Sequence, residues 1–307
     1  MVEWLVADVG GTNTRVGLAD QHGVRNGTSR KFHNEDFAGL APLLAAYMEN
    51  ENAADISAIC AGVAGPVRKD VAQLTNYNWL VEAKALQRAT GAGNVILLND
   101  LQAQGYALDD LSPGHFQPLF EGHADDGPRL VLGLGTGCNV AVVHRIGSSL
   151  LVPPAESGHT SLPFAVGDLG ALCAHLQQIM PHAPIEAALS GPGLARIYGW
   201  LTGRDISPVD MLVAPDRDKT MRLYSALLGL VAGNLCLAHM ATGGLYLIGG
   251  MACAVAPFLA ETEFRENFIS RGPYTHILRD IPIALITDDA AALRGCARYL
   301  AQTHRAS

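Results

Sequence analysis

The chain contains the same glycine-rich stretch twice. Residues Leu5 to Leu18 read LVADVGGTNTRVGL and residues Leu130 to Val143 read LVLGLGTGCNVAVV, so the two copies align without a gap. In each copy an apolar run enters a glycine-rich turn and returns as a second apolar run, which is typical of a β-hairpin. The repeat predicts two related halves, each opening with a hairpin. A chain of 307 residues is long enough for two domains.

The turn of the first copy carries groups that suit a phosphate. Gly10 and Gly11 let backbone N–H groups approach a ligand closely, and Thr12 and Asn13 add a hydroxyl and an amide. The carboxylate of Asp8 would repel a phosphate directly. We therefore expect a Mg²⁺ ion between them, held by Asp8 through water.

The two copies differ at this carboxylate. Gly133 takes the place of Asp8 in the second copy, so only the first copy offers a carboxylate to a metal. Two facing hairpins of this kind can hold a polyphosphate from both sides. A turn that merely reverses the chain uses the same residue types. A purely structural duplication, however, does not need the asymmetry.

Composition excludes several classes of partner and compartment. Hydrophobic residues make up 49% of the chain, and the net charge of −8 argues against nucleic acid or an anionic membrane as the main partner, because both favour basic surfaces.

The six cysteines show no Cys-x-x-Cys spacing, so we expect buried thiols in a reducing cytosol. The start of the chain lacks the features of a signal peptide. The apolar region from Ser225 to Ala241 is interrupted by Asn234 and His239, which predicts a buried helix rather than a membrane span.

An aspartate follows a strand that we expect to be buried. Val95 to Leu98 is a continuous apolar run, as in a parallel sheet covered on both faces, and it ends in Asn99 and Asp100. Ligands of open α/β sheets collect at the carboxyl ends of strands, so Asp100 is well placed for chemistry. The alternative is that Asp100 only caps a helix from Leu101 to Leu108.

Other polar groups lie in stretches of small residues. Glu156 and His159, in the sequence AESGHT, offer acceptors and donors for adjacent sugar hydroxyls, although a lone histidine is more often a satisfied structural residue. The strand expected at Gly244 to Gly250 ends in a glycine pair against which a nucleoside can lie, or which only permits close helix packing. The segment from Thr75 to Trp79, which includes Asn76, can contact a small ligand or form a capped turn.

The remaining pattern predicts an alternation of strands and helices. Further strands are expected at 24–33, 56–63, 129–134, 138–144, 150–152 and 282–287, and helices at 40–48, 81–90, 168–180 and 221–241, with turns at 189–194. A terminal helix is expected to bury Leu293, Cys296, Ala297 and Leu300.

Several short motifs together resemble the bacterial-type glucokinases of the hexokinase, actin and heat-shock ATPase superfamily. In chain order they are DVGGTNTR at 8–15, TNYNW at 75–79, ND at 99–100, GTG at 135–137, ESGH at 156–159, EAALSGPGL at 186–194, GGLYLIGG at 243–250 and DIP at 280–282. Each motif alone is weakly specific. Their order and spacing over nearly the whole chain are strongly specific.

The resemblance implies a fold and an activity. The fold would be a two-domain α/β fold of the ribonuclease H-like, actin-like ATPase type with an inter-domain cleft, and we expect a small domain at 1–103 plus 289–307 and a large domain at 104–288. The activity would be ATP- and Mg²⁺-dependent phosphorylation of the 6-hydroxyl of glucose, the first step of glycolysis, by a cytoplasmic homodimer. Because the chain lacks the P-loop pattern and the protein-kinase signature, phosphoryl transfer would depend on the hairpins.

The resemblance also implies roles for individual residues. Asp100 would accept the hydroxyl proton, and the sugar hydroxyls would be bound by Asn99, Asp100, Glu156, His159 and Glu186. Mg²⁺ and phosphate would be held by Asp8, Gly10, Gly11, Thr12 and Asn13 on one side and by Gly135, Thr136 and Gly137 on the other. Gly249 and Gly250 would border the adenosine.

Four positions depart from the family pattern. Ala155 and Ser157 stand where glycines are usual, so the sugar loop can sit differently. Cys138 and Asn139 replace the common leucine and glycine, and the turn is expected to survive because asparagine tolerates left-handed backbone angles. None of these changes removes a proposed ligand.

Three alternatives remain open. A sugar-sensing regulator on the same fold would usually carry an N-terminal DNA-binding module, whereas the first hairpin begins close to Met1, and residues 160–166 lack the Cys-rich zinc signature of the related repressor, open-reading-frame and kinase family. An ATPase with a protein client would not need Glu156, His159 and Glu186. A kinase for another hexose cannot be distinguished, since hydroxyl-binding carboxylates alone do not separate epimers.

Overall fold

The computed structural model describes residues 3–75 and 77–304, so Asn76 lies outside the described residues. The chain forms two compact units. The first comprises Met1–Ser112, Ile146–Pro154 and Asp288–Ser307, and the second comprises Pro113–Arg145 and Ala155–Thr287. Residues 104–112, 146–154 and 288, which the sequence prediction placed in the large domain, group with the first unit.

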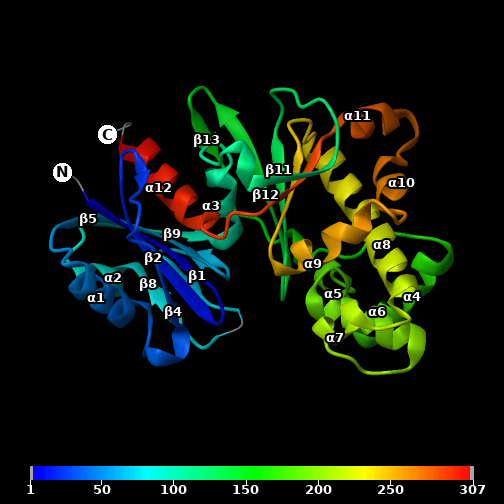
Figure 1. The fold of residues 1–307 in the computed structure, drawn as a ribbon, viewed down its shortest axis with the longest axis horizontal. Coiled ribbons are helices and arrows are strands. Elements are labelled where there is room, and N and C mark those ends of the chain that lie inside the picture. The colour runs from blue at the N-terminus through cyan, green and yellow to red at the C-terminus, as the bar shows by residue number, and fades with distance from the viewer. Residues whose placement is uncertain (1–2, 76, 305–307) are drawn as a thin grey trace. The chain divides into compact units, whose positions relative to one another are not determined.

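A mixed sheet forms the centre of the first unit (Figure 1). Its strand order is β3 (Gly23–Val24), β2 (Asn13–Asp20), β1 (Glu3–Val9), β5 (Ile56–Val63) and β9 (Asn94–Asn99), and β4 (Arg30–His33) also pairs with β2. Strands β1, β5 and β9 are parallel, while β2 runs antiparallel to β1. The single strand predicted at 24–33 is wrong, because a turn with Gly27 at a φ of 77° separates β3 from β4.

Helices cover both faces of this sheet. Figure 1 shows α1 (Leu40–Glu51) and α2 (Ala83–Thr90) on one side, and α3 (Asp100–Ala107) and α12 (Ala291–His304) on the other. The predicted helix at 81–90 begins late, because β8 (Leu80–Glu82) instead pairs with β7 (Val71–Gln73), which pairs with β6 (Val67–Arg68). The predicted apolar stripe of the terminal helix is confirmed, since all of its members are buried: Leu293, Cys296, Ala297 and Leu300.

The second unit repeats the arrangement of the first. Its strand order is β10 (Phe116–Phe120), β15 (Ile283–Ile286), β14 (Leu245–Ile248), β11 (Arg129–Leu134) and β12 (Cys138–Ile146). In both units an antiparallel hairpin is followed by two parallel strands, as β2-β1-β5-β9 and as β12-β11-β14-β15. The predicted duplication is therefore confirmed at the level of topology. The short strand β13 (Ser149–Leu151) falls in the first unit.

Helices make up most of the remainder of the second unit. They are α4 (Gly167–Ile179), α5 (Ile185–Ala188), α6 (Gly191–Thr202), α7 (Pro208–Val213), α8 (Arg217–His239), α9 (Gly250–Leu259), α10 (Phe264–Ile269) and α11 (Thr275–Asp280). The turns predicted at 189–194 are wrong beyond Ser190. The side chain of Ser190 caps α6 by accepting a hydrogen bond from Gly193 N, and Pro192 is tolerated in the first helical turn.

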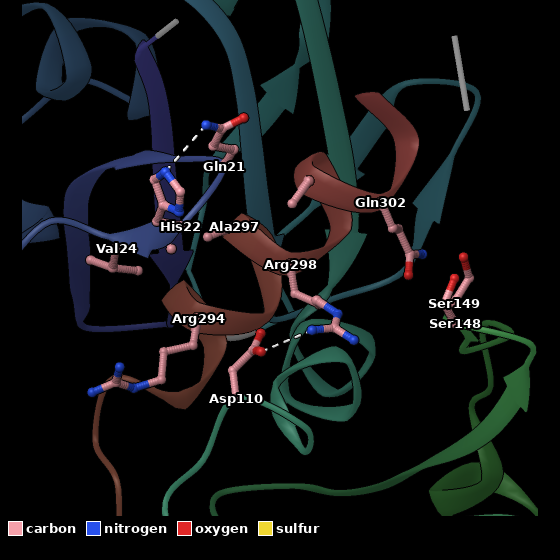
Figure 2. A pocket seen from close by; sticks show the side chains of 12 residues that line it. Gln21, His22, Val24, Asp110, Ser148, Ser149, Arg294, Ala297, Arg298 and Gln302 are labelled. Carbon is pink, nitrogen blue, oxygen red and sulfur yellow. Dashed lines mark hydrogen bonds and ion pairs between the residues drawn. The ribbon is translucent and has the colours of Figure 1, made fainter. Parts of the chain in front are cut away.

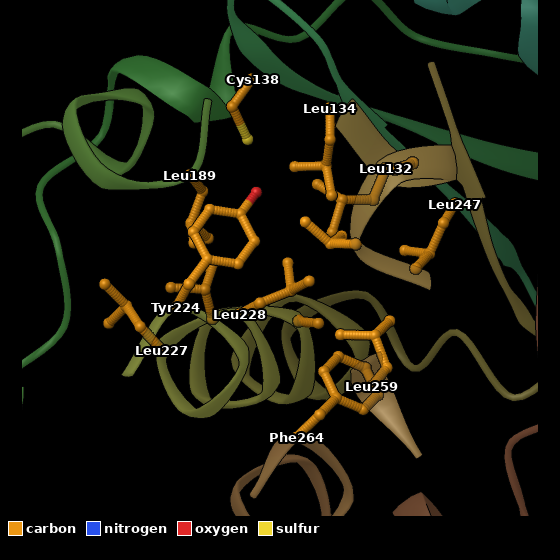
Figure 3. Packing of buried hydrophobic residues seen from close by; sticks show 14 of the residues in the cluster. Leu132, Leu134, Cys138, Leu189, Tyr224, Leu227, Leu228, Leu247, Leu259 and Phe264 are labelled. Carbon is orange, nitrogen blue, oxygen red and sulfur yellow. The ribbon is translucent and has the colours of Figure 1, made fainter. Parts of the chain in front are cut away.

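The long helix α8 forms the centre of the core of the second unit. Figure 3 shows Tyr224 and Leu228 of this helix on the side of Leu132 and Leu247 of the sheet, and Leu227 belongs to the same buried cluster. By length and composition α8 is able to cross a membrane, but 67% of its most apolar window is buried inside the protein. The prediction of a buried core helix is confirmed.

Candidate active site

The first repeat folds as the predicted hairpin. Val9 pairs with Thr14, so residues 10–13 form the loop, and Gly10 N donates a hydrogen bond to Asn13 O at 3.0 Å. The Thr12 side chain is exposed at the tip of this loop. The predicted phosphate-binding residues of the first half therefore share one tight turn.

The second repeat forms a hairpin with a shorter loop. Leu134 pairs with Cys138, which leaves residues 135–137 as the loop, and Gly135 N donates to Gly137 O at 2.9 Å. In the gap-free sequence alignment Thr14 is matched with Asn139, whereas the structurally equivalent residue is Cys138. The alignment is therefore wrong by one residue along the second strand of each hairpin. A hairpin loop can lose a residue while the apolar pattern of its strands stays the same, so sequence comparison did not reveal the change.

A buried asparagine outside the motif holds the first loop in place. Asn34 is fully buried, and its Nδ2 donates to Gly10 O at 2.8 Å while its Oδ1 accepts from Thr14 Oγ1 at 2.8 Å. The backbone N–H of Asn34 also donates to Thr12 O at 2.9 Å. Sequence reasoning missed this residue, since a single asparagine after a strand carries no distinguishing pattern.

Asp8 lies near the carboxyl end of β1, paired with Arg15 on β2. Burial raises the pKa of Asp8 to about 6, and the charge of Arg15 opposes the shift. Within the described residues, the Oδ1 atom of Asn13 is buried and has no hydrogen-bond partner. Carboxylate and amide oxygens are ligands that Mg²⁺ accepts, usually together with several waters. These residues therefore fit the predicted ion.

Asp8 and Asp100 lie at the same edge of the first sheet. Because β1, β5 and β9 are parallel, their carboxyl ends meet there, and Gly62 of β5 lies between β1, which carries Asp8, and β9, which leads into Asp100. Neighbouring strands are about 4.8 Å apart, which separates β1 from β9 by roughly 10 Å. A Cβ atom on Gly62 would lie 3.7 Å from Asp100 Cα and 2.9 Å from Ala103 Cβ. The absence of a side chain at Gly62 thus lets the start of α3 rest on the sheet.

Asn99, not Asp100, caps helix α3. Its Oδ1 accepts from Leu101 N at 3.0 Å, and its backbone N–H donates to Gln102 Oε1 at 3.1 Å. The Asn99 Nδ2 donates to Gly65 O at 3.3 Å, which leaves one further N–H of the amide. The alternative that Asp100 is the cap is therefore wrong, and Asp100 begins the helix.

The second hairpin contacts Glu186, one of the predicted sugar ligands. The backbone N–H of Cys138 donates to Glu186 Oε2 at 2.9 Å, and a Cβ on Gly137 would lie 2.5 Å from the same oxygen. The Cys138 side chain packs in the core, where Figure 3 shows it facing Tyr224. Burial raises the pKa of Cys138 to about 12, and the charge of Glu186 adds to the increase.

The loop with Glu156 and His159 lies directly on this hairpin. A Cβ on Gly158 would lie only 1.6 Å from Cys138 O, so the two backbones are in close contact. Partial burial raises the pKa of Glu156, His159 opposes the shift, and Glu186 adds to it. The three predicted sugar ligands of the second unit are thus brought together beside its hairpin loop.

The glycine pair after β14 lies beside the same hairpin. Gly249 has a φ of 105°, and a Cβ there would lie 2.4 Å from Leu134 O, so close packing explains this glycine. A Cβ on Gly250 would meet no atom within 4 Å. The contact with adenosine stays a prediction for both residues. Trp79 is buried in the first core, which favours the structural interpretation of that residue.

A separate polar pocket of about 440 Å³ lies in the first unit (Figure 2). It lies between α12 and residues 21–24 and 148–149, and no predicted site residue lines it. Its two arginines already have carboxylate partners, because Arg298 contacts Asp110 at 3.0 Å and Arg294 contacts Asp288 at 2.6 Å. This pocket is therefore not part of the candidate active site.

The matches to known proteins cover nearly the whole chain. The family model described as "Glucokinase" matches residues 5–303. The glucokinase of Brucella abortus (strain 2308) is 31% identical over 309 residues, covering 96% of this chain and 90% of that protein. The glucokinase of Psychromonas ingrahamii is 30% identical over 97% of both chains. The crystal structure of glucokinase from an Antarctic psychrotroph superposes with a TM-score of 0.86 at 29% identity, covering 98% of this chain and 99% of that one, which confirms the predicted type of fold.

Proposed function

Because the chain belongs to the glucokinase family, we propose that it transfers the γ-phosphoryl group of ATP to the 6-hydroxyl of glucose. The products are glucose 6-phosphate and ADP. The observation that carries this proposal is the contact between the second hairpin and a pair of carboxylates, Glu156 and Glu186. A backbone loop suited to phosphate and side chains suited to hydroxyls are adjacent there, as a sugar kinase requires.

On the acceptor side, Asp100 is the proposed general base. It takes the proton of the 6-hydroxyl as the hydroxyl oxygen bonds to the γ-phosphorus, and the bond from that phosphorus to the bridging oxygen of ADP breaks. Asn99, Glu156, His159 and Glu186 orient the sugar through its other hydroxyls. The protein performs little covalent chemistry in such a transfer, since alignment and charge stabilisation supply most of the rate.

On the donor side, the two hairpins are the proposed phosphate ligands. The backbone N–H groups of residues 11–13 and 136–137 are proposed to suit phosphate oxygens, whereas those of Gly10 and Gly135 close their own loops. A Mg²⁺ ion held near Asp8 and Asn13 would neutralise negative charge on the phosphates. Gly249 and Gly250 are proposed to border the adenosine.

Replacing Asp8 with asparagine is expected to stabilise the protein while reducing its activity. The pKa of Asp8 is raised to about 6 in the folded state, above the roughly 3.9 of an unfolded chain. The folded protein therefore holds more protons between these values, and its stability falls as the pH rises from about 4 to 6. Asparagine cannot ionise, so the variant does not incur the cost of burying a charged carboxylate. Its free energy of unfolding should therefore exceed that of the wild type by up to about 3 kcal/mol above pH 6.

Urea denaturation of both proteins between pH 4.5 and 8 measures this difference. The advantage of the variant should grow up to about pH 6 and then stay constant. A difference that does not change with pH would show that Asp8 titrates normally. Activity should fall at least about tenfold and respond less to Mg²⁺ concentration.

A coupled ADP-release assay over a panel of hexoses tests the proposed function directly. We expect turnover with glucose that requires both ATP and Mg²⁺, and little ADP release without sugar. A clear preference for mannose, fructose or an amino sugar would keep the kinase and change its substrate. ATP hydrolysis independent of every sugar would overturn the proposal, and sugar binding without any turnover would favour the regulator.

We further propose that the enzyme works as a homodimer in the cytoplasm. All six cysteines are free thiols, as suits a reducing compartment. Light scattering coupled to size-exclusion chromatography measures the oligomeric state, and a mass of about one chain would refute the dimer.

A further inference from the structure

Asn139 connects the second hairpin to the loop that carries Glu156. Its Nδ2 donates to Ala155 O at 2.8 Å and to Glu156 Oε2 at 3.0 Å. Its Oδ1 accepts from Val140 N at 2.8 Å. The Nδ2 atom faces two acceptors and the Oδ1 atom faces a donor, so exchanging the two atoms by rotating the amide would lose all three hydrogen bonds.

The contact joins two of the positions at which the sequence departs from the family pattern. A glycine at position 139 could make neither bond, and the alanine at position 155 is held through the carbonyl that Asn139 contacts. Glycine loops owe their mobility to backbone freedom. Here a side chain fixes the loop from the hairpin instead.

The contact also acts on the charge of Glu156. Partial burial contributes most to raising the pKa of Glu156, His159 lowers it and Glu186 raises it further. A hydrogen bond such as the one that Asn139 Nδ2 donates to Glu156 Oε2 is stronger to the ionised carboxylate than to the protonated form. An ionised carboxylate can accept hydrogen bonds from two adjacent sugar hydroxyls.

We propose that Asn139 is a positioning residue for glucose. It holds the carboxylate of Glu156 in place, and it ties the sugar loop to the hairpin that is proposed to bind phosphate. The inference rests on the proposed function, since it assigns Glu156 to the sugar. Asn139 itself contacts neither reacting atom.

The test compares Asn139→Gly and Asn139→Asp with the wild type. Titration calorimetry measures the Kd of glucose, and steady-state assays measure kcat and the KM of ATP. For Asn139→Gly we expect glucose affinity to fall roughly five- to twentyfold, as for the loss of a hydrogen bond to a charged group, with the KM of ATP and the melting temperature little changed. Asn139→Asp keeps the size and the bond to Val140 N but places a carboxylate against Glu156, so the loss should be larger.

The pH dependence separates positioning from a merely structural role. In Asn139→Asp the loss of glucose affinity should shrink as the pH falls towards 5, because protonating one of the facing carboxylates restores a donor. Unchanged glucose affinity in both variants, or equal losses for glucose and ATP, would overturn the inference. A wild-type protein that neither binds nor phosphorylates glucose would overturn the proposed function as well, whereas an active wild type with unaffected variants would overturn only the role of Asn139.

Discussion

Asp100→Ala is expected to lower kcat by roughly 10²- to 10⁴-fold, the usual contribution of a general base. Without a proton acceptor the 6-hydroxyl is a poor nucleophile, while the groups proposed to orient the sugar remain. The KM of glucose should therefore change much less than kcat. The helix start is preserved, because Leu101 N still donates to the Asn99 cap at 3.0 Å. Steady-state kinetics over a range of glucose and ATP concentrations measures the effect.

Two further variants control this experiment. Asp100→Asn keeps the size of the side chain but cannot accept the proton, so its kcat should fall by a similar factor. Asp110→Asn removes an exposed carboxylate that contacts Arg298 in the same unit and lies outside the proposed site. Its kcat should stay near the wild-type value. Wild-type turnover in Asp100→Ala with unchanged pH dependence would remove Asp100 from the mechanism.

Features that repeat along the chain were predictable from the sequence. Both hairpins, the parallel strand that leads to Asn99, and the terminal helix follow from apolar periodicity and glycine turns. These patterns are local, and the burial of each element follows from its own composition. The edge strand β10 was missed, because Gln117 and Pro118 interrupt its apolar pattern.

Contacts between distant residues were not predictable in the same way. The bonds from Asn34 to the first loop and from Asn139 to Glu156 join different segments, and no spacing rule marks either asparagine. The one-residue difference in loop length was also hidden, since both copies keep their apolar alternation. Register and side-chain direction depend on tertiary packing, which a single sequence does not specify.

Gly158→Ala is expected to lower kcat/KM for glucose by roughly 10²- to 10³-fold. The added Cβ would lie 1.6 Å from Cys138 O and 2.7 Å from Cys138 C, and both are backbone atoms that cannot rotate away. The loop must therefore shift by more than about 1 Å, which displaces Glu156 and His159. A misplacement of this size is enough to cost about 10²-fold in rate. Steady-state kinetics and calorimetry with glucose measure the loss.

Gly158 is buried, but the clash is confined to one contact between the 157–159 turn and the start of β12, so we expect the fold to survive. We expect the free energy of unfolding to fall by about 1–3 kcal/mol, as for other overpacked sites. Gly114→Ala provides the matched control in the same unit, since a Cβ there would meet no atom within 4 Å. If Gly158→Ala kept wild-type affinity for glucose, the loop would not position the sugar. Glu186 would then be the one remaining carboxylate in this unit proposed to bind its hydroxyls, and Glu186→Gln should abolish glucose binding.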